Sequence, residues 1–287
     1  MIAIFKHELA SYYKGFTGYI FAAFMLLFTG IYSMAYNLKS LVANFEYPIA
    51  SLSFLYIIVI PILAMKGLAE ERHQKTDQLL YSLPVSMFDV VFGKYLAMLV
   101  VLAVPMLIVC VYPLVLSRYG DVNLQVAYAN IFAFFLLGAV LIAIGLFVSA
   151  LSENQIVAAG MCIIVMLLNY FLSDLAEYVS SKESTSFFAF MAVGLLAGLI
   201  FYLMTKNSLG ALIITFVIEA SLLAVFLLKS EVYAGLFPAV VKQLSVFTRY
   251  TTFVNGIFDI GAVVYMISVA ALFVYLSVQA MDRRRYN

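Results

Sequence analysis

The sequence predicts an all-α, polytopic helical membrane protein with about eight transmembrane helices and both termini in the cytoplasm. Three observations support this fold class. Hydrophobic residues make up 66% of the 287 residues and charged residues only 11%, whereas a soluble domain carries about 25% charged residues. The apolar residues form continuous runs instead of alternating with polar ones, which excludes a transmembrane β-barrel. Lysine and arginine also gather on one side of the predicted spans.

Eight apolar runs are long enough to cross a bilayer, which takes about 20 helical residues. They are separated by short polar segments, so the whole chain forms one transmembrane domain, residues 1–287. We expect the spans at residues 16–36, 48–66, 93–116, 126–150, 155–173, 187–204, 208–228 and 259–280.

The distribution of basic residues predicts the orientation. With the N-terminus inside, ten basic residues lie on the inner side: Lys6, Lys14, Lys66, Arg72, Lys75, Lys94, Lys206, Arg283, Arg284 and Arg285. Six lie on the outer side: Lys39, Arg118, Lys182, Lys229, Lys242 and Arg249. Because cytoplasmic loops carry the excess of Lys and Arg, this bias places both termini in the cytoplasm. We therefore expect a multi-pass protein of the inner or plasma membrane.

Residues 1–14 are expected to form a short amphipathic helix at the inner membrane surface. Apolar side chains at helical spacing define one face, and the charged residues fall elsewhere. This pattern is typical of a helix that lies in the interface plane. A frayed terminus is the alternative, and the even spacing favours the helix.

The most strongly charged interval of the chain runs from Lys66 to Lys94, and we place a cytoplasmic loop at residues 67–92. Within it Leu79, Leu80 and Leu83 share one stripe of a short helix. Pro84 stops or kinks that helix. A charged, half-apolar helix just outside the membrane is typical of a docking surface for a soluble partner. A solvated loop with its leucines on the lipid explains the pattern equally well.

The longest outer segment covers residues 229–258 and contains an apolar stripe at helical spacing. We expect one or two short interfacial helices in this extracytoplasmic loop, or a surface loop that only connects two spans.

Glu219 is a candidate intramembrane polar site, because it is the one ionisable residue near the middle of a predicted span. A charged group at the centre of a helix costs about 2.5 to 3.5 kcal/mol on insertion scales. One interpretation is that Glu219 faces protein or water and lines a pathway. The other is a protonated carboxyl bonded to a neighbouring helix.

No enzyme constellation is present, so we expect no catalytic residues and no metal site. The sequence contains no GxSxG, HExxH or P-loop motif. Cys110 and Cys162 lie in apolar runs and form no metal-ligand spacing. The net charge of +1 gives no indication of nucleic-acid binding. ATP and Mg²⁺ would therefore be bound by another chain.

Residues 70–96, EERHQKTDQLLYSLPVSMFDVVFGKYL, resemble the first cytoplasmic loop of ABC-2 type transporter permeases, a group that includes the gliding-motility and nitrous-oxide-reductase maturation permeases. The turn SALSENQIVAAG at residues 149–160 and the last span with its basic tail are also similar to the family. Matching positions in the first loop are Glu71, Thr76, Asp77, Leu79, Leu80, Leu83, Pro84, Val85, Ser86, Gly93 and Lys94.

The resemblance implies the permease subunit of an ATP-driven transporter, with export as the expected direction. Its partners would be a dimer of soluble ABC ATPases and a second permease, identical or related. Residues 1–14 match the family's connecting helix. Because the family core has six spans, the segment 187–228, which contains Glu219, is an extra helical hairpin. A secondary transporter or channel that uses Glu219 is the alternative function. The residues expected to couple to the ATPase are Glu70, Glu71, Arg72, Thr76, Asp77, Leu79, Leu80, Leu83 and Pro84.

Overall fold

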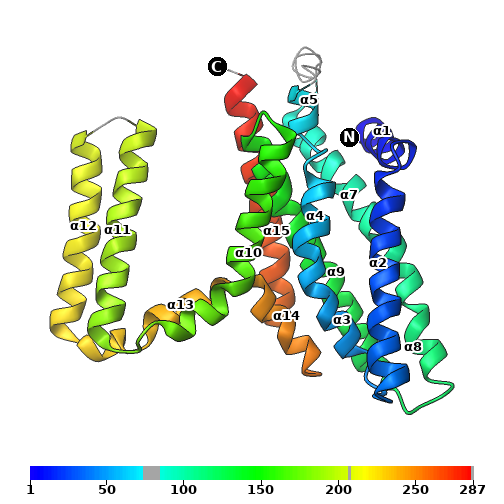
Figure 1. The fold of residues 1–287 in the computed structure, drawn as a ribbon. Helices are drawn as coiled ribbons and strands as arrows, with labels where there is room; N and C mark the ends of the chain where they lie inside the picture. Colours follow the sequence, from blue (N-terminus) through cyan, green and yellow to red (C-terminus); the bar gives the residue numbers. More distant parts are fainter. Residues whose placement is uncertain (74–84, 206–207, 286–287) are drawn as a thin grey trace. The chain divides into compact units, whose positions relative to one another are not determined.

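The structure is a computed structural model that describes residues 1–73, 85–205 and 208–285 (Figure 1). Every regular element in these ranges is helical. The order is α1 (Ile2–Lys14), α2 (Thr17–Ser33), η1 (Met34–Lys39), α3 (Glu46–Leu52), η2 (Ser53–Leu55), α4 (Tyr56–Ala64), α5 (Ala69–His73), α7 (Met87–Val109), α8 (Val111–Leu116), α9 (Leu124–Leu151), α10 (Gln155–Tyr178), α11 (Glu183–Thr205), α12 (Ser208–Leu228), η3 (Ser230–Tyr233), α13 (Leu236–Leu244), α14 (Val246–Val254) and α15 (Ile260–Arg285).

Seven stretches of the described chain are long and apolar enough to cross a membrane. They are Thr17–Lys39, Glu46–Arg72, Met87–Leu116, Leu124–Leu151, Gln155–Tyr178, Ser208–Leu228 and Ile260–Arg284. The remaining predicted span, 187–204, falls on α11, whose apolar part Glu183–Leu199 is shorter. The prediction of a polytopic, all-α membrane protein is therefore confirmed, with seven such spans among the described residues.

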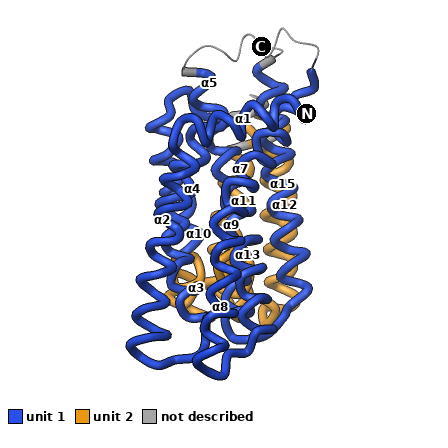
Figure 2. Tube along the Cα trace, turned by 90° about the vertical axis from the view of Figure 1, so that its right-hand side faces the viewer, with its two compact units in different colours: residues 1–170, 249–287 blue, residues 171–248 orange. Residues whose placement is uncertain are grey.

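The chain forms two compact units, which Figure 2 colours separately. Unit 1 contains Met1–Tyr170 and Arg249–Asn287, and unit 2 contains Phe171–Thr248. Within unit 1, the two ends of the chain lie at the same end of the helix bundle (Figure 1). That end also holds α1, α5 and the turn between α9 and α10, and we call it the termini end.

Helix α9 forms the centre of unit 1 and packs against α15, α4, α7 and α3. Of its most apolar 18 residues 78% are buried, against 28% for the first span, because α9 is apolar all round and has other helices on every side. The Phe134 ring of α9 stacks on the Tyr56 ring of α4 with centroids 4.2 Å apart. Two glycines of α9, Gly138 and Gly145, let neighbouring helices approach closely.

Proline interrupts the third span where a neighbouring helix provides a hydrogen-bond partner. Helix α7 ends at Val109, and α8 continues to Leu116 with Pro113 inside it. The Tyr128 hydroxyl of α9 donates a hydrogen bond of 3.0 Å to the Cys110 carbonyl at this break. A backbone break inside a bilayer is tolerated when another helix satisfies the exposed groups.

Unit 2 contains the hairpin of α11 and α12, with η3 and α13 packed against it. Phe187 of α11 stacks on Phe226 of α12 with ring centroids 4.4 Å apart, and Tyr233 of η3 packs edge-on against both rings. The hairpin is therefore closed by an aromatic cluster at the end that bears η3. The segment expected to carry one or two short helices contains η3, α13 and α14.

We predict that Gly145→Ala lowers the stability of unit 1 and that Gly160→Ala does not. A Cβ on Gly145 would lie 2.6 Å from the Ala64 Cβ and 3.2 Å from the Cys162 Sγ, whereas nothing lies within 4 Å of a Cβ on Gly160. Overpacking at Gly145 should cost about 1 to 3 kcal/mol. The thermal midpoint of the detergent-purified protein measures this difference. Equal midpoints for the two variants would contradict the close α4–α9 contact.

Candidate functional site

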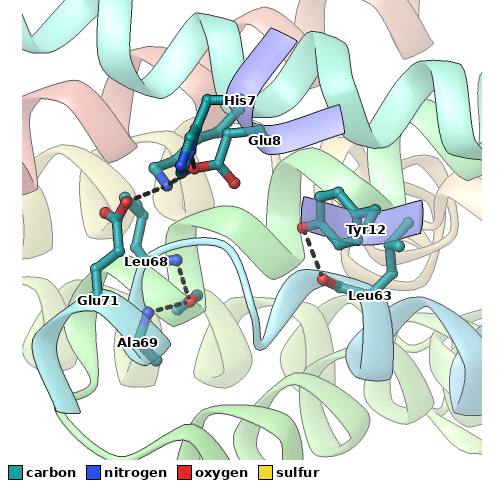
Figure 3. A network of polar contacts seen from close by, with 9 residues as sticks. His7, Glu8, Tyr12, Leu63, Leu68, Ala69 and Glu71 are labelled. Carbon is teal, nitrogen blue, oxygen red and sulfur yellow. Dashed lines mark hydrogen bonds and ion pairs between the residues drawn. The ribbon is translucent and has the colours of Figure 1, made fainter. Parts of the chain in front are cut away.

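The second span is broken near the termini end, and other helices satisfy the exposed backbone groups of the break. Helix α4 ends at Ala64, and α5 begins at Ala69. The Tyr12 hydroxyl of α1 donates a hydrogen bond of 3.1 Å to the Leu63 carbonyl (Figure 3). On the other side of the break, the Leu68 and Ala69 amides donate to the Ser149 Oγ of α9, at 3.2 and 2.9 Å. The break is therefore a built feature held by α1 and α9.

The glycine at position 67 and the raised pKa of Tyr12 also favour this break. A Cβ on Gly67 would lie 3.1 Å from both the Ala64 carbonyl oxygen and the Leu146 Cδ1, so glycine lets the turn press against α9. Burial, followed by the nearby carboxylates of Glu8, Glu70 and Glu71, raises the pKa of Tyr12 well above its ordinary value. The Tyr12 hydroxyl therefore keeps its proton and remains a hydrogen-bond donor to the break.

A buried lysine joins three helices beside this break. The Lys94 side chain of α7 is 1% exposed. Its Nζ lies 2.7 Å from Oε1 of Glu8 on α1 and 2.6 Å from Oε1 of Glu71 on α5. Figure 3 shows Glu8 and Glu71 converging from their two helices. We call Glu8, Glu71 and Lys94 the Lys94 cluster.

Gly93, the residue before Lys94, allows α1 to come close enough for Glu8 to reach Lys94. A Cβ on Gly93 would lie 3.4 Å from both the Ile4 Cγ2 and the Met1 carbonyl oxygen. Glycine therefore allows α1 to lie directly on α7, which brings Glu8 to Lys94. His7 is close to the same carboxylate, 3.9 Å from the Glu8 Oε1, but its own side chain is 83% exposed.

The Lys94 cluster needs its members together. Removing an ammonium from water is costly, and close, hydrogen-bonded carboxylates offset that cost. Here one ammonium serves two carboxylates, so its loss would leave two negative charges facing each other. A buried ion cluster whose members are paired in this way favours one arrangement of α1, α5 and α7.

Arg72 ties α5 to the opposite side of the bundle. Its side chain is buried, and its Nη1 donates to the Ser152 carbonyl at 3.0 Å, just after α9 ends. Its Nη2 lies 3.1 Å from the Met281 Sδ of α15. Nearby on α15, Arg284 Nη2 donates to the Leu151 carbonyl at 2.9 Å. Glu71 thus connects α5 to α7 and, through Lys94, to α1. The next residue, Arg72, connects α5 to the end of α9 and to α15.

The chain re-enters the bundle through a capped helix start. Ser86 precedes α7, and its Oγ accepts a hydrogen bond of 3.1 Å from the Asp89 amide. This side chain satisfies one of the free amides of the first turn. Both ends of the segment between α5 and α7 are therefore held, one by Glu71 and Arg72 and the other by Ser86 and Lys94.

Only part of the predicted coupling set falls on described residues. Glu70, Glu71 and Arg72 lie on α5. The other six lie outside the described residues: Thr76, Asp77, Leu79, Leu80, Leu83 and Pro84. Reasoning from sequence missed Glu8, Tyr12 and Ser149. The Gly93-Lys94 pair was noticed only as a motif, although a lysine at the start of an apolar run already needs a partner.

Glu219 lies at the contact between α11 and α12 in unit 2. A Cβ on Gly194 of α11 would come within 2.6 Å of the Glu219 Oε1 and 3.0 Å of the Ile218 Cγ2. Gly198, one turn further, faces Thr215 of α12 in the same way. Both carboxyl oxygens of Glu219 are buried, and no hydrogen-bond donor reaches them among the described residues. Gly194 therefore provides the space in which this carboxyl sits, and Gly198 provides space for Thr215.

The polar side chains at the termini end form ion pairs and hydrogen bonds that join helices. Within residues 1–73, 85–205 and 208–285, no group of three or more His, Cys, Asp or Glu side chains could hold a metal ion. The fold and the termini-end network define an integral membrane protein of several apolar spans, in which buried polar contacts hold α5 and the start of α7.

A family comparison gives the class more narrowly. The model of the ABC-2 family transporter proteins matches residues 23–278, which is most of the chain. The protein belongs to this family and is the permease component of an ABC transporter in the cell membrane. Comparisons with curated proteins and with solved structures gave no match.

We predict that Lys94→Met destabilises unit 1 strongly, by about 3 to 5 kcal/mol, because it leaves Glu8 and Glu71 buried without their cation. Adding Glu8→Gln and Glu71→Gln to the same variant should restore most of the loss. Thermal midpoints in detergent measure both effects.

Lys242→Met is the matched control for this prediction. Lys242 pairs with Glu177 at 2.9 Å, but the two side chains are 40% and 66% exposed, so the loss should stay below about 1 kcal/mol. If Lys94→Met and Lys242→Met had the same small effect, the Lys94 cluster would have no structural role.

Proposed function

We propose that this permease couples to a separate dimer of ABC ATPases through the loop of residues 67–92, and that the transporter exports its substrate. The observation that carries this proposal is the Lys94 cluster, because it anchors both ends of that loop to the bundle. A loop meant only to connect two spans would not need a buried ammonium shared by three helices. Family membership supports the same function.

The proposed mechanism follows the contacts outward from the loop. ATP binding closes the two ATPase subunits, and the docked loop moves with them. Because α5 lies at the start of this loop, it moves next. Glu71 passes the displacement to α7 and α1 through Lys94, and Arg72 passes it to the end of α9 and to α15. The break at residues 65–68 lets α5 turn without bending the rest of the span.

The composition of the complex follows from the number of docking loops. One chain supplies one such loop, and an ABC ATPase acts as a dimer. Two permeases, identical or related, would therefore work with two ATPases, which bind ATP and Mg²⁺. In this arrangement the termini end faces the cytoplasm, as the excess of Lys and Arg at that end supports.

The alternative, a secondary transporter or channel that uses Glu219, has less support. Such a protein needs an ionisable group that faces a pathway. The Glu219 carboxyl is closed between α11 and α12, against Gly194. We therefore assign Glu219 a place in the packing of the added hairpin.

We predict that Leu80→Asp abolishes ATPase binding, or leaves binding intact and abolishes the permease-dependent change in ATP hydrolysis. A carboxylate on the apolar stripe of the docking helix would have to be desolvated in the complex. Co-purification with the ATPase and hydrolysis rates in proteoliposomes measure the two outcomes. Val232→Asp, an exposed position in η3, is the control. Normal binding together with normal coupled hydrolysis in Leu80→Asp would rule out the docking role.

We also predict that Glu219→Gln keeps ATP-dependent activity of the reconstituted complex within about twofold, since the amide has the shape of the carboxyl it replaces. The measurement is ATP hydrolysis together with the thermal midpoint. Loss of activity with an unchanged midpoint would instead favour a role for Glu219 in a pathway.

A further inference from the structure

The junction of α1 and α2 combines exposed aromatic rings with two ammonium groups. We call Tyr13, Lys14, Gly15, Phe16 and Tyr19, together with Lys66, the α1–α2 elbow. Helix α1 ends at Lys14, and the second helix begins at Thr17, which is also the start of the first span. The elbow therefore lies where the chain enters the bilayer.

The aromatic part of the elbow is held outward by an unusual backbone. Phe16 has φ +60° and ψ −9°, in the left-handed region, which glycine adopts without strain and phenylalanine does not. Its side chain is 69% exposed, and that of Tyr19 is 57% exposed. The Tyr19 ring packs edge-on against Tyr13, 5.2 Å away, and tilted against Phe16, 6.4 Å away. The strained backbone of Phe16 thus places its ring on the exposed surface.

The cationic part of the elbow lies beside these rings. A Cβ on Gly15 would lie 3.5 Å from the Lys66 Nζ, so this half-buried lysine of the second span reaches the end of α1, next to Lys14. Neither Lys14 nor Lys66 forms an ion pair within the part of the chain that the structure describes. By contrast, Lys94, Lys242 and Arg284 each pair with a carboxylate.

The negative end of the α1 helix dipole balances only part of the positive charge of Lys14 and Lys66. A helix C-terminus carries about half a negative charge, which one nearby lysine already balances. Two lysines leave an excess positive charge at the depth of the lipid headgroups. The carboxylates of Glu8 and Glu71 are engaged by Lys94. Tyr12, which lies near Glu8, Glu70 and Glu71, is two residues from Lys14 and so points to a nearly opposite face of α1.

We propose that the α1–α2 elbow binds the anionic headgroup of a membrane phospholipid. Lys14 and Lys66 would hold the phosphate, and the Phe16 and Tyr19 rings would lie among the glycerol and upper acyl groups, where aromatic side chains are favoured. Anionic lipids attract basic groups next to a span. Because Lys66 lies in the break of the second span, next to Gly67, the lipid would contact the element that leads into the coupling loop.

The experiment uses the absence of tryptophan from the chain. Phe16→Trp places a single fluorophore in the elbow of the full-length protein, which is then reconstituted into vesicles. Bromine-labelled phosphatidylglycerol or bromine-labelled phosphatidylcholine quenches it in proportion to lipid binding nearby. We expect phosphatidylglycerol to bind about fivefold more strongly, the preference of the one lysine whose charge the end of α1 does not balance. Adding Lys14→Gln and Lys66→Gln should bring the ratio to about one.

Two controls separate the elbow from the rest of the surface. Phe258→Trp reports on another exposed aromatic position and should show no preference for phosphatidylglycerol. Tyr19→Trp gives a second reporter in the elbow should tryptophan at position 16 prevent folding. Soluble glycerol phosphate at millimolar concentration should leave the quenching unchanged, and competition by it would assign the site to a free phosphate.

Equal quenching by the two lipids at Phe16→Trp, or a preference that survives the loss of both lysines, would overturn the proposal. If the double-lysine variant lost ATPase binding but kept its lipid preference, the elbow would belong to a protein partner instead. All lipid measurements use the permease without an ATPase, so their outcome does not depend on whether the proposed coupling function is correct.

Discussion

The contact on which the termini end depends is the ammonium of Lys94 between the carboxylates of Glu8 and Glu71. This ammonium is almost completely buried, so it must be paired at close range. Its two partners come from separate helices: α1, which is amphipathic, and α5, which is only five residues long. This one charged group therefore joins both helices to α7, and Gly93 lets α1 approach α7 closely.

A second constraint concerns the buried break in the second span. Where neighbouring helices exclude water, each free amide or carbonyl at a helix break needs a protein partner. The second span breaks beside Gly67, and the partners are a tyrosine of α1 and a serine of α9. The hydrogen bonds that make the break tolerable also connect it to two other helices. Movement of α5 must consequently either preserve these contacts and take the neighbours with it or exchange them.

The spans and the N-terminal helix could be predicted because each follows from local composition and from the period of its apolar residues. The ion pairs could not, since Lys94 meets Glu8 across 86 residues and Glu71 across 23, and only packing decides which carboxylates are near. The α4–α5 break carried no proline signal at its own position. The four-residue spacing of Gly194 and Gly198 is typical of a helix contact, but the register of α11 against Glu219 is a tertiary property.

Hydrogen–deuterium exchange of the assembled transporter, with and without trapped ATP, tests most directly whether the loop and the bundle move as connected parts. The account predicts that ATP changes the exchange of amides in residues 65–73 together with those of α1, since Lys94 and Tyr12 join the two segments. Changes confined to the loop, with unchanged exchange in α1 and across the break, would contradict it.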